Sequence, residues 1–147
     1  MKKVYRELLI GHIFGATYLT IEVCYRGYSH LSMYLLAFVI GHVIGGLNEF
    51  YPYMDLKLQC LFGMIIATLG EGIVGIIVNN ILHLNVWDYS NMPFNLLGQI
   101  CLPFAIMWIP LSFLAILLDD YLRYNWFGEE KPSYRSIILE KIKSLKK

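Results

Sequence analysis

The sequence contains one acidic residue inside its most apolar stretch. Glu71 lies about midway along Leu58–Leu82, a run made largely of aliphatic residues and glycine. An ionised carboxylate at the centre of a bilayer costs about 2.5–3.5 kcal/mol on insertion scales, so Glu71 must be neutral, paired or next to a wet cavity. Gly75 and Asn79 follow at i+4 and i+8, roughly on the same helix face. An intramembrane acid indicates a functional site, and a structural hydrogen bond between helices is the alternative.

Further polar residues are predicted at the same end of the helices. Glu22 and Arg26 are four apart, in the order that favours an ion pair on a helix. Asn95 and Gln99 are also four apart, at the expected start of the last helix. This one-sidedness predicts a polar cavity that opens to one side of the membrane. The residues expected to bind its ligand are Glu22, Arg26, His30, Glu71, Asn79, Asp88, Asn95 and Gln99.

The connector "NVWDYSNMPFN", residues 85–95, is unusually rich in polar and aromatic side chains that can form hydrogen bonds. Asp88 and Ser90 can bond backbone amides in a tight turn. Trp87 and Tyr89 suit the headgroup region of a bilayer. One interpretation is a capped and anchored turn. The other is a lid over the buried acid, with Trp87, Tyr89 and Ser90 as the lid residues.

No catalytic motif with a specific spacing occurs, since HExxH, GxSxG and the phosphate-binding GxxxxGK[ST] are all missing from the sequence. The four histidines are not spaced as metal ligands. No metal, no cofactor and no nucleic-acid partner are therefore expected, although folding could still bring a histidine to Glu71 or Asp88. Cys24, Cys60 and Cys101 form no CxxC and are interpreted as small apolar residues, with pairing of Cys24 and Cys101 left open.

The composition predicts an integral membrane protein with a single domain over residues 1–147. The chain is 57% hydrophobic and only 16% charged, against about 45–50% and about 25% in ordinary soluble domains. A spanning helix needs about 20 mostly apolar residues. The fold class expected is therefore all-α, a bundle of four transmembrane helices. The expected spans are about 8–25, 32–50, 58–82 and 94–118.

The basic residues predict the orientation. Those outside the spans lie before the first, between the second and third, and after the fourth, with Arg26 as the exception. The positive-inside rule then places both termini in the cytoplasm. The membrane expected for the protein is the inner (plasma) membrane. The connectors at residues 26–30 and 85–95 would share the outer face.

Residues 119–147 are expected to form a cytoplasmic tail. After Pro132, Ser133 can cap a helix whose apolar residues fall on one face and whose lysines occupy the rest. This pattern is typical of an interfacial amphipathic helix that binds anionic lipid, and a frayed charged tail is the alternative. The polar residues at the inner helix ends, Asn48, Glu49, Asp119, Asp120 and Arg123, are interpreted as simple helix-end solvation, and His42 as a hydrogen-bonded core histidine.

The second half of the chain resembles a known family. The resemblance rests on Glu71, on Trp87–Ser90 (WDYS), on Pro93 with Asn95, on Gly98–Leu102 (GQICL) and on Trp108. In these positions the sequence is similar to the bacterial membrane family called "putative ABC-transporter type IV". The first half departs from the segment that follows span one in many members, where this chain has "RGYSHLSMYLLAFVIGHVIGG". The family name implies a permease. Four spans are few for one, so the resemblance implies a homo-oligomer or a partner membrane subunit.

Three functions remain open at this point. The first is a transporter-like membrane protein with an outward-facing polar site for a small molecule or an ion. The second is an intramembrane enzyme that acts on a lipid headgroup or small amphiphile, with Glu71 or Asp88 as the acid or base. The third is a non-catalytic accessory subunit, in which the polar residues only lock helices together.

Overall fold

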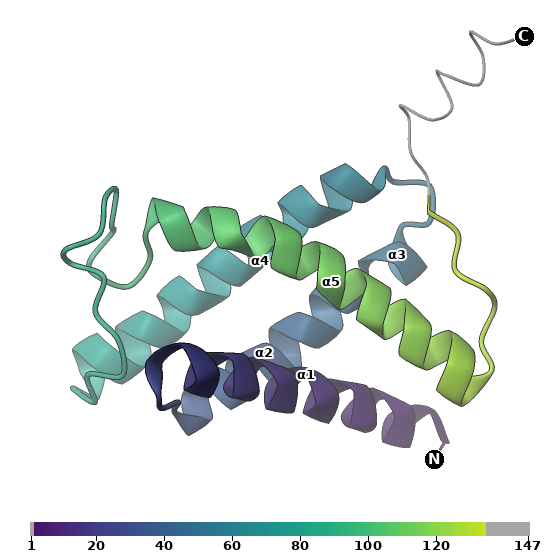
Figure 1. Ribbon diagram of the computed structural model, residues 1–147, viewed down its shortest axis with the longest axis horizontal. Helices are drawn as coiled ribbons and strands as arrows, with labels where there is room; N and C mark the ends of the chain where they lie inside the picture. Colours follow the sequence, from purple (N-terminus) through teal and green to yellow (C-terminus); the bar gives the residue numbers. More distant parts are fainter. Residues whose placement is uncertain (1, 135–147) are drawn as a thin grey trace, which may run out of the picture.

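The computed structural model describes residues 2–134, and within them the chain is helical with no strands (Figure 1). The helices are α1 (Lys2–Arg26), α2 (Leu31–Gly45), α3 (Leu47–Phe50), α4 (Leu56–Gly75), the π-helical turn η1 (Ile76–Ile81) that continues α4, and α5 (Leu102–Phe127). Four helical segments are long and apolar enough to cross a membrane, namely Lys3–Arg26, Leu31–Phe50, Leu56–Ile81 and Leu102–Phe127. The predicted all-α membrane bundle is confirmed.

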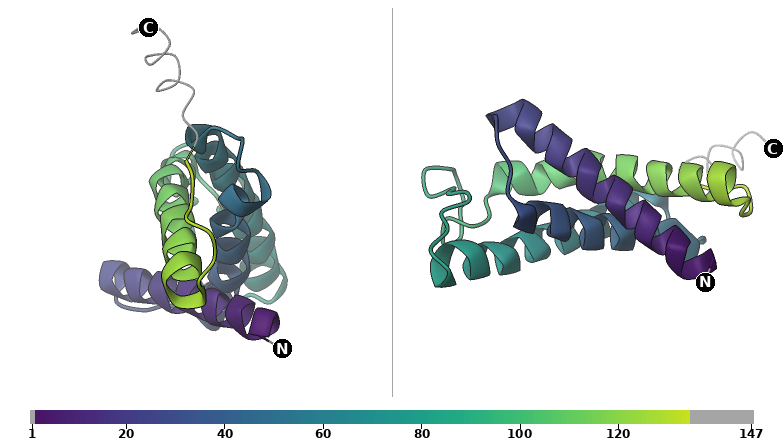
Figure 2. Two further views of the ribbon diagram at one scale, coloured as in Figure 1. Left: turned by 90° about the vertical axis from the view of Figure 1, so that its right-hand side faces the viewer. Right: turned by 90° about the horizontal axis from the view of Figure 1, so that it is seen from below.

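Helix α2 is the central element, because it packs against α1, α4 and α5. A core of Ile40, Ile44, Ala67 and Ile116 joins α2, α4 and α5. Helices α4 and α5 also pack directly on each other, whereas α1 crosses the bundle and contacts α5 less extensively (Figure 2). The consequence is a compact three-helix unit with α1 laid across it.

A glycine allows α4 and α5 to approach each other closely. A Cβ atom added at Gly63 would collide with the side chain of Ser112 and lie 2.6 Å from its Cβ. Gly72, on the same helix, has more room, since the nearest atom to an added Cβ is Ile100 Cγ2 at 3.4 Å. In a bilayer, small residues permit the close backbone approach that holds helices together. Gly63 is therefore a packing residue.

The last spanning helix begins and ends later than the predicted span of residues 94–118. Residues 82–101 form a folded loop instead. Phe94 and Leu97 have φ angles of 53° and 54°, which a right-handed helix excludes. At the other end, α5 continues past residue 118 to Phe127, where Gly128 (φ 68°) closes it in the left-handed conformation. Residues 119–127 are thus helix and not tail.

The predicted amphipathic helix falls almost entirely outside the described residues. The structure describes the chain as far as Tyr134, and residues 129–134 are not helical. The proposed interfacial helix over residues 133–147 therefore stays a prediction.

Gly63→Ala should lower the free energy of unfolding by about 1–3 kcal/mol, because the added methyl group forces α4 away from Ser112. Gly72→Ala is the matched control and should be neutral or stabilising. Thermal unfolding in detergent measures both. Equal melting temperatures for the two variants would contradict the close α4–α5 packing.

Candidate functional site

Glu71 is buried, 2% exposed, and is held by two neutral donors. The Tyr89 hydroxyl donates to Oε1 at 2.9 Å, and the Trp108 indole N–H donates to Oε2 at 3.2 Å. Tyr89 belongs to the loop of residues 82–101 and Trp108 to α5, so the carboxyl group of α4 joins three parts of the chain. Among residues 2–134 no ion pair includes Glu71. The site is an acid held by donors and not by a cation.

Two amides tie the loop to the end of α4. Asn79 donates to Trp87 O at 3.0 Å and to Gln99 Oε1 at 2.7 Å, while its own Oδ1 accepts from the backbone of Val86 at 2.6 Å. Gln99 in turn donates to Asn80 Oδ1 at 3.1 Å. The π-helical turn over Ile76–Ile81 is wider than an α-helical turn, and it contains both asparagines. The amides therefore hold the loop against α4 just above Glu71.

The turn predicted in the connector is present. Asp88 Oδ1 accepts from the Ser90 hydroxyl at 2.5 Å and from the Ser90 backbone at 2.8 Å. These bonds, the hydroxyl first, hold the pKa of the Asp88 carboxyl below its ordinary value. Asn95 Nδ2 closes the turn on Ser90 O and Met92 O, both at 3.0 Å. Asp88 is exposed and makes its bonds within the turn, so the structure does not bring it to Glu71.

Two aromatic residues of the loop point their polar atoms into the protein. Trp87 is 6% exposed and donates its indole N–H to Gln99 O at 3.0 Å, so it packs inside the loop. Tyr89 stacks on Phe104 with ring centroids 4.7 Å apart and points its hydroxyl inward to Glu71. Burial, and then the neighbouring Glu71, raises the pKa of Tyr89, so its hydroxyl remains a donor. Both residues therefore make hydrogen bonds inside the protein, and their depth relative to the headgroups stays a prediction.

The remaining predicted site residues form a second group. Arg26 and Glu22 make the expected ion pair at 2.7 Å, and Ser29 bonds the same carboxylate. Arg26 also donates to Val86 O at 3.0 Å, which links this group to the loop. His30 caps α2 by accepting from the backbone of Ser32 at 3.2 Å. The structure thus joins Asn79 to Gln99 and brings Tyr89 to Glu71, but places Glu22, Arg26 and His30 beside the loop.

Asn95 and Gln99 were predicted at the start of the last helix, but they lie in the loop. Their spacing of four suggested one helix face, yet positive φ angles at neighbouring residues fold the chain back on itself. Gln99 nevertheless reaches Asn79, because the loop returns it to the end of α4.

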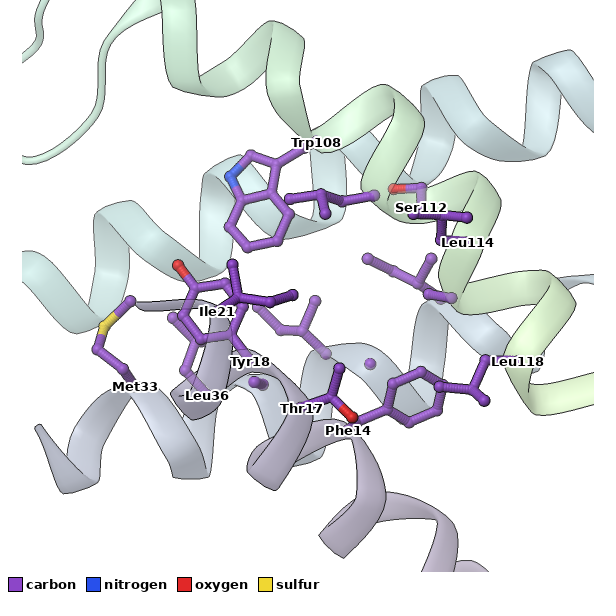
Figure 3. Close-up of a pocket in the computed structure, with 16 residues that line it drawn as sticks. Phe14, Thr17, Tyr18, Ile21, Met33, Leu36, Trp108, Ser112, Leu114 and Leu118 are labelled. Carbon is purple, nitrogen blue, oxygen red and sulfur yellow. The ribbon is translucent and has the colours of Figure 1, made fainter. Parts of the chain in front are cut away.

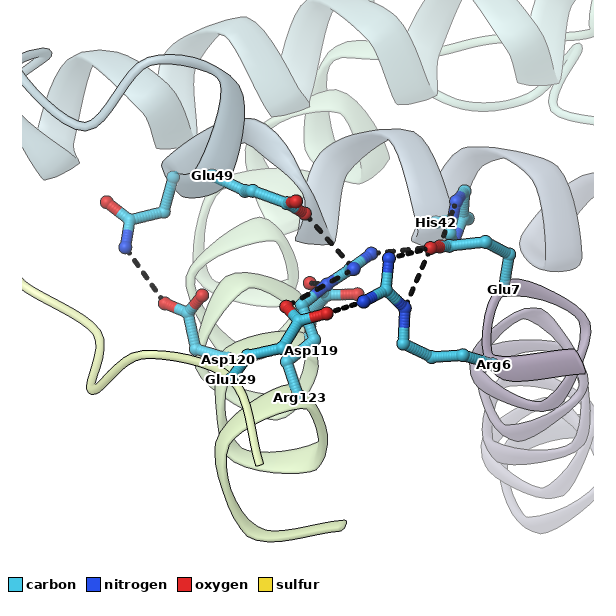
Figure 4. A network of polar contacts seen from close by, with 9 residues as sticks. Arg6, Glu7, His42, Glu49, Asp119, Asp120, Arg123 and Glu129 are labelled. Atoms are coloured by element: carbon cyan, nitrogen blue, oxygen red, sulfur yellow. Dashed lines mark hydrogen bonds and ion pairs between the residues drawn. The ribbon is translucent and has the colours of Figure 1, made fainter. Parts of the chain in front are cut away.

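A larger polar cluster lies at the opposite end of the bundle (Figure 4). Arg123, 5% exposed, pairs with Asp119 at 2.5 Å, with Glu7 at 3.1 Å and with Glu49 at 3.1 Å. Arg6 pairs with Glu7 and with Glu129. His42 Nε2 lies 3.1 Å from Glu7 Oε2.

This cluster is called the inner network below, and it consists of Arg6, Glu7, His42, Glu49, Asp119, Arg123 and Glu129. The interpretation of the helix-end residues as solvated was wrong for Asn48, Asp119, Asp120 and Arg123, which are buried, whereas Glu49 is exposed. Asp120 is also held, by Asn48 at 3.0 Å. The i,i+4 spacing of Asp119 and Arg123 is the one signal in the sequence that could have indicated the pair.

The comparisons with known proteins agree with the architecture. The family model described as "Putative ABC-transporter type IV" matches residues 2–140. The chain belongs to this family. No curated protein and no solved structure gives a significant match. The match of the "Putative ABC-transporter type IV" model extends over the first half of the chain as well as the WDYS half, so the whole four-helix unit is the family domain. This member is accordingly a multi-pass membrane protein.

In this family member the described residues include no group of three or more histidine, cysteine or acidic side chains that could hold a metal ion. All three cysteines are free. Cys24 is exposed and Cys101 is buried, so the pairing left open from the sequence is not formed. A cavity of about 580 Å³ adjoins the inner network between Asn48, Asp120, Arg123 and the segment 128–133.

Arg123→Gln should lower the free energy of unfolding by about 3–5 kcal/mol, because it leaves the carboxylate of Asp119 buried without its cation. Arg26→Gln is the matched control, since it breaks a single ion pair near the opposite end and should cost about 1 kcal/mol. Chemical or thermal unfolding in detergent compares them. A loss for Arg123→Gln no larger than that of the control would show that the inner network is not a structural centre.

Proposed function

We propose that this chain is the membrane-spanning component of a transporter, and that Glu71 binds a small molecule or ion beneath the loop of residues 82–101. One observation carries the proposal. The loop reaches into the bundle with the Tyr89 hydroxyl, which donates to a carboxyl group buried in α4. Intramembrane acids with this placement mark substrate or ion pathways.

The hydrogen-bond donors around Glu71 can be replaced by a ligand more easily than the partners of a buried ion pair. Tyr89 and Trp108 contribute neutral O–H and N–H groups, so a cation or proton that displaces them gains the full charge of the carboxylate. Withdrawal of Tyr89 needs movement of the loop and leaves Trp108 in place. We interpret the described arrangement as the closed state of the site, with Tyr89 as its lid.

The orientation proposed for the site is outward. The basic residues of the sequence favour cytoplasmic termini, which puts Arg26, Asp88 and the loop on the outer side of the plasma membrane. Four spans provide one small bundle, so a second copy or a partner membrane subunit is proposed to complete the pathway. The inner network would then face the cytoplasm.

A non-catalytic accessory subunit is the second candidate. The observation in its favour is that Asn79 and Gln99 satisfy each other and the loop backbone. Amides bonded in this way fix helices and loops without offering a group to a ligand. The two candidates differ in whether Tyr89 leaves Glu71 during function.

Tyr89→Phe should raise the rate at which Cys101 reacts with a membrane-impermeant maleimide added outside intact cells. Cys101 is buried at the end of the loop, and Cys24→Ser with Cys60→Ala removes the other thiols. Loss of a hydrogen bond worth about 1 kcal/mol or more favours the open loop by at least about fivefold. Tyr25→Phe, on an exposed residue of α1, is the control and should leave the rate unchanged. Labelling that requires permeabilised cells would overturn the orientation. Equal rates for the two variants would overturn the lid.

Glu71→Gln should keep the fold but abolish ion coupling, because an amide retains the shape and a hydrogen-bond acceptor and loses the charge. Proteoliposomes on a solid-supported membrane provide the measurement, with jumps of proton, sodium or potassium concentration. The wild-type protein should give a transient charge movement for one of these ions, and Glu71→Gln should give none. Identical responses from both proteins, with equal melting temperatures, would favour the accessory subunit, in which Glu71 has only a structural role.

A further inference from the structure

An apolar groove runs between α1, α2 and α5 (Figure 3). Its volume is about 140 Å³. The floor is α2, and the walls are formed by the other two helices. The residues that define it best are Phe14, Tyr18, Ile40, Trp108, Ala115 and Leu118. All three helices are membrane-spanning segments, so the groove lies at the depth of the lipid hydrocarbon.

The groove opens sideways, because α1 and α5 diverge (Figure 2). Thr17 and Ile21 form the rim on α1, and both are exposed, Ile21 by 47%. Leu114 forms the rim on α5 and is 58% exposed. Whatever fills the groove therefore enters from the bilayer and not from water.

The volume of the groove fits a short stretch of a hydrocarbon chain, with the rest of the chain along its open side. Its lining on α2 extends from Met33 to Ile44, which is about 16 Å along a helix axis, close to half of the roughly 30 Å hydrocarbon core. Apolar cavities of about 150 Å³ stay dry and take benzene-sized ligands. A helix, about 10 Å across, cannot enter a space of this volume. An unfilled groove would deprive its lining of dispersion contacts.

We propose that this groove is a binding site for one acyl chain of a membrane phospholipid. The chain lies along α2 between α1 and α5, and its headgroup remains outside the groove. The bound chain also supports Trp108, which lines the groove, stacks on Tyr18 at 5.7 Å and donates to Glu71 at 3.2 Å. The site goes beyond the proposed transport function and does not depend on movement of the loop.

Photo-crosslinking tests the proposal with the full chain in vesicles of phosphatidylcholine that carries a diazirine in mid-chain. Crosslinks identified by mass spectrometry should concentrate on groove-lining residues of α1, α2 and α5. Thr17→Phe fills the mouth of the groove and should lower their yield several-fold. Thr20→Phe makes the same change on the same helix, at an exposed residue outside the groove, and should leave the yield unchanged.

Crosslinks spread evenly over the exposed faces of all spans, with the same yield in both variants, would overturn the site and indicate only bulk lipid contact. Disulfide-linked dimers of Thr17→Cys that form in place of lipid crosslinks would instead show a second copy against the groove. If Thr17→Phe does not fold, Leu114→Trp obstructs the opposite rim and must lower the same crosslinks. Neither result depends on Cys101 labelling, so the lipid site and the lid stand or fall separately.

Discussion

A bilayer core contains no water to solvate a polar group, and Glu71 lies where that restriction is most severe. Its carboxyl group must therefore find its partners within the protein. It does so through Tyr89 from the loop and Trp108 from α5. Satisfying one buried acid thus fixes the position of the loop, the start of the last helix and the contact between α4 and α5.

The two ends of the bundle meet the same demand by different chemistry. The loop end uses neutral amides, hydroxyls and an indole, whereas the inner network uses charges around Arg123. Neutral bonds can be exchanged for water or a ligand at moderate cost, while removing one partner of a buried ion pair leaves an uncompensated charge. This contrast favours movement at the loop and rigidity at the end of the bundle that contains Arg123. The lateral groove lies between them, and Trp108 both lines the groove and donates a hydrogen bond to Glu71.

Hydropathy predicted the helical class and the spans well, because every long helix must carry an apolar run. It could not locate the start of α5. The apolar residues before Leu102 belong to a loop that is held by bonds from Asn79 and turns through positive φ angles, and neither feature has a periodic signal in the sequence. The need of Glu71 for partners inside the protein was predicted from the cost of burying a carboxyl group in lipid. The pairing of Glu7 with Arg123 could not be, because it joins the two ends of the chain and arises only when α1 crosses α5.

Solid-state NMR of the protein in lipid bilayers tests the central claim most directly, with carbon-13 in glutamate and tyrosine and nitrogen-15 in the tryptophan indole. The Glu71 carboxyl carbon, assigned by its loss in Glu71→Gln, should show a through-space contact to the Tyr89 ring and dipolar coupling to the Trp108 indole nitrogen. Coupling to Trp108 without any contact to Tyr89 would contradict the closed lid. A Glu71 carboxyl in contact with neither ring would contradict the whole account of the site.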